Sequence, residues 1–237
     1  MAPVGRAETT QSACCVRTMR VVEVAQALVK PRLRGVFHEI GFYVATATGA
    51  AMVVTAEPGR ARTAATIFAS CVVICFGASA VYHRPTWRPR ARAWLARLDH
   101  AGVYLLIAGS YAPFGLIVMS RGWAIPVLAI VWGGALVAIL LKLVWLQAPK
   151  WLSAAIGLVL GWVGAAAFPQ LLRLSPVAVL LVVASGVLYS AGAVVYARRR
   201  PDPHPHVFGY HELFHLLTLA AAACLYVVVA FYVLPGA

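Results

Sequence analysis

Residues 123–146 read WAIPVLAIVWGGALVAILLKLVWL, a run in which Lys142 is the one charged side chain. A stretch of about 20 apolar residues is long enough to cross the hydrocarbon core of a bilayer as a helix. This run is therefore predicted to be a transmembrane helix. Lys142 lies near one end of it, where we expect its long side chain to reach the lipid headgroups.

The composition extends this prediction to the whole chain. Of its 237 residues, 62% are hydrophobic and 11% are charged, and the mean hydropathy is +0.83. Soluble domains carry about 25% charged residues. The body of the protein is therefore not a soluble enzyme, a disordered tail or a nucleic-acid-binding module. We expect membrane lipids, and no nucleic acid, as its partners.

Seven apolar runs predict an all-α membrane domain with seven transmembrane helices. We expect this domain to cover residues 34–237, after a basic cytoplasmic tail of residues 1–33 that lacks the apolar core of a signal peptide. The predicted spans are residues 38–56, 63–83, 99–119, 123–146, 151–171, 176–197 and 209–234.

The distribution of basic residues predicts the orientation. With seven spans, 16 of the 20 lysines and arginines fall on the side of the N-terminus and 4 on the other side. Cytoplasmic loops carry the excess of Lys and Arg in membrane proteins. The N-terminus is therefore predicted to be cytoplasmic and the C-terminus to be outside.

The five cysteines do not suggest a disulfide framework. Cys14 and Cys15 are adjacent, whereas Cys71, Cys75 and Cys224 lie within apolar runs. We expect the latter three to pack as small hydrophobic side chains.

Ionisable side chains are costly inside a membrane and mark functional sites. His83 ends the second span, Asp99 begins the third, and His211 and His215 begin the seventh, so all four are predicted at one depth near the inner leaflet. Two histidines four residues apart share one helix face and can bind one ion. With His83 they would supply the three protein ligands typical of a catalytic zinc. The alternative is a set of packing histidines that hydrogen-bond to one another.

Two further residues are candidates for the chemistry of this site. Asp99 could take a proton from the attacking water or orient a ligand, and Ser79 lies one turn before His83, where it could bond water or substrate. Cys75 is about 12 Å along the helix from His83, too far to share its ion. His38 and Glu39 begin the first span at the same level, where they could support the site or cap the helix.

The segment His211-Glu212-Leu213-Phe214-His215 also matches the H-E-x-x-H pattern of zinc proteases, in which the glutamate is the general base. A membrane-embedded protease is therefore an alternative. In the other interpretation, Glu212 pairs with nearby arginines and faces away from the metal.

Three segments together resemble the bacterial hemolysin III proteins, which are similar to the progestin and adipoQ receptors and, more distantly, to the alkaline ceramidases. They are residues 79–83 (SAVYH), residues 98–100 (LDH) with residues 107–113 (IAGSYAP), and residues 208–215 (FGYHELFH). Many members carry a Glu, Asn and Thr-His pattern in the first helix, where this chain has His38-Glu39-Ile40-Gly41. The role of the first helix at the site stays open.

The resemblance implies a multi-pass protein of the bacterial inner membrane that binds Zn²⁺ through His83, His211 and His215. It also implies Asp99 as acid/base, Ser79 as a polar group lining the site, and hydrolysis of a fatty acyl or ceramide-like lipid amide. Two alternatives are a non-enzymatic membrane sensor or homeostasis protein with structural zinc, and a cytolytic, pore-forming hemolysin.

Overall fold

The computed structural model describes residues 30–236. The predicted tail as far as residue 29, with Cys14 and Cys15, lies outside the described residues. The described part is α-helical and has seven helical stretches long and apolar enough to cross a membrane. This confirms the predicted all-α, seven-span architecture.

The elements follow the predicted spans closely. They are α2 (Val36–Thr55), α3 (Arg60–His83), α4 (Pro89–Pro113) with the π-helical turn η1 (Phe114–Val118), α5 (Arg121–Val144), α6 (Lys150–Trp162) with the 3₁₀ turn η2 (Val163–Ala167) and α7 (Phe168–Leu171), α8 (Pro176–Arg198), and α9 (Tyr210–Val228) with the turns η3 (Val229–Val233) and η4 (Leu234–Gly236).

One boundary differs clearly from the prediction. The third span was predicted to begin at residue 99, but α4 begins ten residues earlier, at Pro89. Proline is favoured in the first turn of a helix, where its missing N–H costs nothing. The arginines that follow Pro89 lower the local hydropathy, so a search for apolar runs does not detect this part of the helix.

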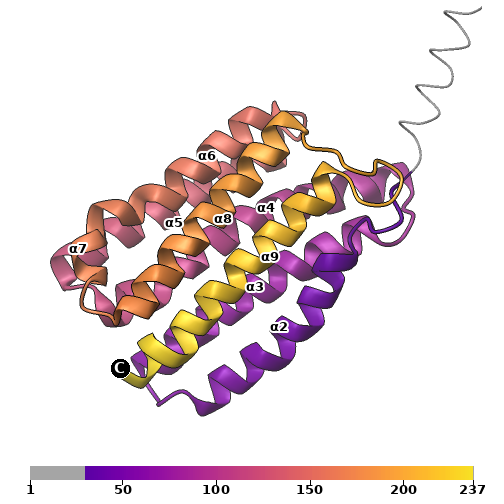
Figure 1. Cartoon of the computed structure of the whole chain (residues 1–237). Coiled ribbons are helices and arrows are strands. Elements are labelled where there is room, and N and C mark those ends of the chain that lie inside the picture. The colour runs from indigo at the N-terminus through magenta and orange to yellow at the C-terminus, as the bar shows by residue number, and fades with distance from the viewer. Residues whose placement is uncertain (1–29, 237) are drawn as a thin grey trace, which may run out of the picture.

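The helices form a closed ring. Each transmembrane stretch packs against the next along the chain, and α2 also contacts α9, so that the first and last described spans are neighbours. In Figure 1, α9 (yellow) lies between α2 (indigo) and α8 (orange). This closure brings together residues from opposite ends of the sequence.

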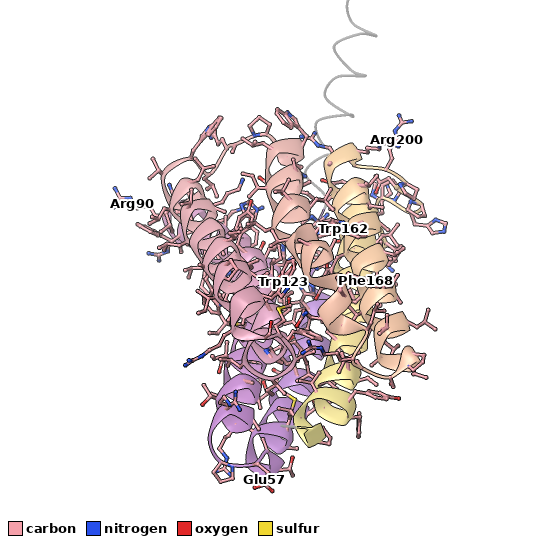
Figure 2. The ribbon with its side chains drawn as sticks, turned by 90° about the vertical axis from the view of Figure 1, so that its left-hand side faces the viewer. Glu57, Arg90, Trp123, Trp162, Phe168 and Arg200 are labelled. Carbon is pink, nitrogen blue, oxygen red and sulfur yellow. The ribbon has the colours of Figure 1, made fainter. Side chains whose placement is uncertain are left out.

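The two ends of the bundle differ in the number of basic residues that they carry. Figure 2 shows Arg90 and Arg200 at one end and Glu57 at the other. We call the end that carries Arg90 and Arg200 the basic end. Helix α3 ends there, and α4 and α9 begin there, so His83 and the first turns of α9 lie at the same level.

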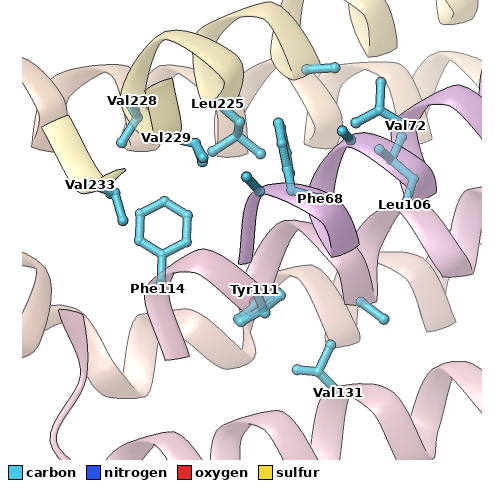
Figure 3. Packing of buried hydrophobic residues seen from close by; sticks show 14 of the residues in the cluster. Phe68, Val72, Leu106, Tyr111, Phe114, Val131, Leu225, Val228, Val229 and Val233 are labelled. Carbon is cyan, nitrogen blue, oxygen red and sulfur yellow. The ribbon is translucent and has the colours of Figure 1, made fainter. Parts of the chain in front are cut away.

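The other half of the bundle is a tightly packed apolar core. Figure 3 shows Phe68 of α3 and Phe114 of η1 near Leu225 and Val228 of α9. Glycine allows close approach of two helices: a Cβ built on Gly109 of α4 would overlap the Cβ of Cys71 on α3. The core therefore holds α3, α4 and α9 in a fixed relation below the basic end.

Tyr111 supports the break between α6 and α7. Its hydroxyl donates to the carbonyl of Gly161 (2.5 Å) and accepts from the N–H of Gly164 (2.9 Å). Irregular backbone at membrane depth requires such partners, because lipid offers none.

Candidate metal centre

Three histidines from two helices meet at the basic end. His211 and His215 lie on one face of α9, His83 is the last residue of α3, and all three are buried. One ring nitrogen from each lies within 4.8 Å of the others, and the Nε2 atoms of His83 and His211 are 3.1 Å apart. This group could hold a metal ion, as the spacing in the sequence predicted.

The ring planes fit a common ligand position. The imidazole of His83 is tilted by 69° to that of His211 and by 59° to that of His215, and the latter two are tilted by 61° to each other. The lone pair of a histidine nitrogen lies in the plane of its ring. Rings inclined in this way can direct their lone pairs at one point.

Backbone hydrogen bonds join the segment before α2 to the loop before α9. The N–H groups of Arg32 and Leu33 donate to the carbonyls of His206 and Val207, at 3.0 and 3.1 Å. Gly35 then turns the chain into α2 with φ of +82°, and a Cβ at this position would lie 2.6 Å from the Cβ of His83. A glycine is needed here for both the conformation and the space.

Asp99 lies beside the cluster. Its Oδ2 is 3.4 Å from Nε2 of His83, and the side chain is buried. Ser79, one turn before His83, is 1% exposed, and its Oγ has no hydrogen-bond partner among the described residues. Asp99 therefore lies beside the three histidines, and Ser79 lies one helical turn from His83.

His38 is a fourth histidine at this site, whose role the sequence left open. It is 3% exposed and stacks on His215, with ring centroids 3.8 Å apart and planes inclined by 10°. It also stacks on Phe76, and within residues 30–236 neither ring nitrogen has a hydrogen-bond partner. One feature of the sequence indicated that His38 lies at this site: its predicted depth in the membrane, which it shares with His83 and Asp99.

Two carboxylates near the cluster, those of Glu39 and Glu212, are paired with arginines. Glu212 accepts from the N–H of Gly209 (2.9 Å), as part of a capping box, and pairs with Arg34, while Glu39 pairs with Arg84 (2.6 Å). These contacts agree with the interpretation in which Glu212 binds arginine, and they disfavour it as the base of a protease.

The cluster opens on a large apolar cavity. The cavity measures about 290 Å³ and is enclosed mainly by α4, α6, α8 and α9. His38, Asp99, His211 and His215 form part of its wall at the basic end, and the rest is mostly aliphatic and aromatic. Sequence reasoning missed this cavity, because its walls come from helices that are distant along the chain.

The position of the Lys142 side chain differs from the prediction. We expected it to reach the lipid headgroups, but its side chain is 3% exposed and lines the same cavity. Its position on α5 faces the interior of the ring rather than the surrounding lipid. Hydropathy alone does not distinguish these two faces of an apolar helix.

The remaining histidines and cysteines lie outside the ligand group. His204 and His206 are exposed in the loop before α9. Cys71, Cys75 and Cys224 are free thiols, of which the first two are buried.

Comparisons with known proteins agree with this architecture. The family model described as "Haemolysin-III related" matches residues 26–226. The chain is 33% identical to Hemolysin-3 of Bacillus cereus over 152 residues, which covers 63% of this chain and 66% of that protein. It is 30% identical to the Hemolysin-3 homolog of Bacillus subtilis (strain 168) over 168 residues, which covers 70% of this chain and 76% of the relative. This chain, a multi-pass membrane protein, therefore belongs to the hemolysin III family.

Proposed function

We propose that this protein is a zinc-dependent hydrolase of a lipid amide, with its site near the cytoplasmic face of the bacterial inner membrane. The observation that carries the proposal is the junction of the three-histidine cluster and Asp99 with an apolar cavity of about 290 Å³. A purely structural ion does not require such a cavity, whereas a hydrolase needs space for the acyl chain beside the reacting group.

The residues present fit zinc. Ligand nitrogens about 2.0–2.1 Å from a tetrahedral zinc lie about 3.3 Å from one another. The Nε2 atoms of His83 and His211 are 3.1 Å apart, close to this value, and one ring nitrogen from each of the three histidines lies within 4.8 Å of the others. Three imidazoles would match the number of protein ligands in catalytic zinc sites. When bound, zinc polarises a carbonyl group and lowers the pKa of water toward ~7.

Asp99 is the proton acceptor in this proposal. Its buried carboxylate lies 3.4 Å from a ligand nitrogen and lines the cavity, so it can accept the proton of a water that attacks the amide carbon. When the C–N bond breaks, the same carboxyl group can return the proton to the departing amine. The products are a fatty acid and a free amine.

Ser79 and the cavity have supporting roles. The Ser79 hydroxyl has no partner among the described residues and lies one turn before His83, where it can hydrogen-bond to the Asp99 carboxylate. The apolar wall binds the acyl chain and excludes bulk water, which strengthens the electrostatic interactions at the site.

The Asp99→Asn variant tests the proposal. If Asp99 is the acid/base, the variant keeps its zinc and its fold but loses about 100- to 10,000-fold in the rate of hydrolysis of a ceramide-like amide. Zinc content and turnover are measured on the same preparation. Asp202→Asn is the control, because Asp202 lies in the loop before α9, where it accepts from the N–H of Tyr210 (2.8 Å).

Two other outcomes would contradict the proposed role. If Asp99 only orients a ligand, zinc binding weakens about 10- to 100-fold. If neither zinc nor turnover changes, Asp99 has no part in either. A wild-type protein that binds zinc but hydrolyses no lipid amide would favour the non-enzymatic membrane sensor.

A further inference from the structure

A second polar group lines the cavity, on the wall formed by α4, α5 and α6. We call it the Lys142 cluster; it consists of His100, Tyr104, Lys142 and Ser153. None of these residues belongs to the histidine group that could hold a metal. The cluster contributes a lysine to a cavity whose wall is otherwise largely apolar.

The cluster lies at the level of the candidate metal centre. Nε of Arg97 on α4 donates to the carbonyl of Leu143 on α5 at 2.9 Å, which places Lys142 beside the turn of α4 that carries Asp99 and His100. The Tyr104 hydroxyl donates to the carbonyl of Ser153 at 3.3 Å and so joins α4 to α6. Lys142 and the histidines therefore share one end of one cavity.

Lys142 has no anionic partner among the described residues. Its side chain is 3% exposed, and no ion pair within residues 30–236 includes it. Each carboxylate within residues 30–236 has another contact or lies far from Lys142. Glu57 lies at the far end of the bundle. The others have contacts of their own: Glu39 with Arg84, Asp99 with His83, Asp202 with the N–H of Tyr210, and Glu212 with Arg34.

Other polar atoms of the cluster are also unpaired. Nδ1 of His100 and Oγ of Ser153 are buried without a hydrogen-bond partner in the described part of the chain. Burying a charged group is costly unless it is paired and hydrogen-bonded. A buried lysine without an anionic partner among the described residues, in the wall of a cavity, is an arrangement suited to an anion on a ligand.

We propose that Lys142 binds a carboxylate carried by the amine part of the substrate, so that the preferred substrates are N-acyl amino acids rather than neutral lipid amides. This inference rests on the proposed function. With the amide at the histidines and the acyl chain in the apolar part of the cavity, the amine part remains at the basic end, where Lys142 lies. The carboxylate of a released fatty acid would instead form at the histidines.

A matched pair of amides tests the inference. N-oleoylglycine and N-oleoylethanolamine have the same acyl chain and differ by a carboxylate and a hydroxymethyl group. The full-length, zinc-loaded protein in nanodiscs is expected to have the higher kcat/KM for N-oleoylglycine. Lys142→Met should lower the ratio of the two kcat/KM values about 10- to 100-fold, as expected for loss of a hydrogen bond to a charged group. Lys142→Arg should largely preserve the ratio.

Lys150→Met is the matched control. Lys150 lies at the same end, but its Nζ donates to the Tyr210 hydroxyl at 2.7 Å. The control should keep the wild-type ratio. Melting temperature and zinc content show whether each variant is folded, and Lys142→Gln provides a second neutral variant. An unchanged ratio in the folded Lys142→Met or Lys142→Gln protein would overturn the inference.

Binding measurements separate this inference from the proposed function. The probes are the same two amides, together with oleate and oleyl alcohol. If neither amide is hydrolysed but N-oleoylglycine binds more tightly in a Lys142-dependent manner, the proposed function fails and the carboxylate site stands. If Lys142 affects the binding of oleate but not of N-oleoylglycine, the site serves a free fatty acid and the inference is wrong.

Discussion

At the residue scale, ring orientation distinguishes the four histidines of the site. His83, His211 and His215 are steeply inclined to one another, whereas His38 and His215 are nearly parallel, at 10°. The lone pairs of two stacked rings lie in two parallel planes, so one ion cannot lie in the planes of both rings. We therefore assign His38 to positioning the ring of His215.

This assignment predicts the behaviour of one variant. His38→Phe keeps an aromatic ring against His215 and removes both nitrogens, so the purified protein should retain the zinc content of the wild type. Metal analysis of the folded variant checks this. Loss of most of the zinc would make His38 a ligand and would contradict the geometric argument.

The sequence also had clear limits at this scale. The depth and spacing of the ionisable residues predicted the grouping of His83, Asp99, His211 and His215, because helix geometry determines where each of them lies along the membrane. The stacking of His38 and the interior position of Lys142 depend on the rotation of helices about their axes. That rotation is set by tertiary packing.

At the scale of the elements, close contact between α3 and α4 holds His83 beside Asp99. The contact depends on Gly109, where an added Cβ would overlap both the Cβ and the Sγ of Cys71.

Hydropathy predicted the transmembrane spans but placed the start of α4 too late. It did not predict the turns η1, η2 and η3, because these short turns produce no periodic pattern of apolar residues.

The Gly109→Ala substitution tests this contact. Overpacking of a well-packed core costs about 1–3 kcal/mol, and we expect a lower melting temperature of the protein in detergent. Gly133→Ala is the control, because a Cβ on Gly133 of α5 meets nothing within 4 Å. If the two variants melt at the same temperature, the α3–α4 contact can adjust to an added methyl group. That result would contradict the dependence of the contact on Gly109.

At the scale of the whole molecule, closure of the ring produces the site. The segment before α2 bonds to the loop before α9, and these two segments are more than 170 residues apart in the chain. The metal centre and the Lys142 cluster then share one cavity that no single helix contains. The number of spans was predictable from the sequence, but the cavity was not.

The distribution of basic residues predicts how this bundle lies in the membrane. A reporter that is active only outside the cytoplasm should work when it is fused after Ala237 and fail when it is fused to the N-terminus, because 16 of the 20 lysines and arginines fall on the N-terminal side. The reverse pattern would place the basic end, and the site with it, at the outer face.

Metal analysis tests the central claim most directly. Purified wild-type protein is expected to contain about one zinc per chain, and His83→Ala, which removes one of three ligands, should lose most of it. His204→Ala, in the exposed loop at the same end, and Glu212→Gln, whose carboxylate bonds Gly209 and Arg34, should retain it. A folded His83→Ala protein with full zinc occupancy would contradict the claim that α3 and α9 share one ion.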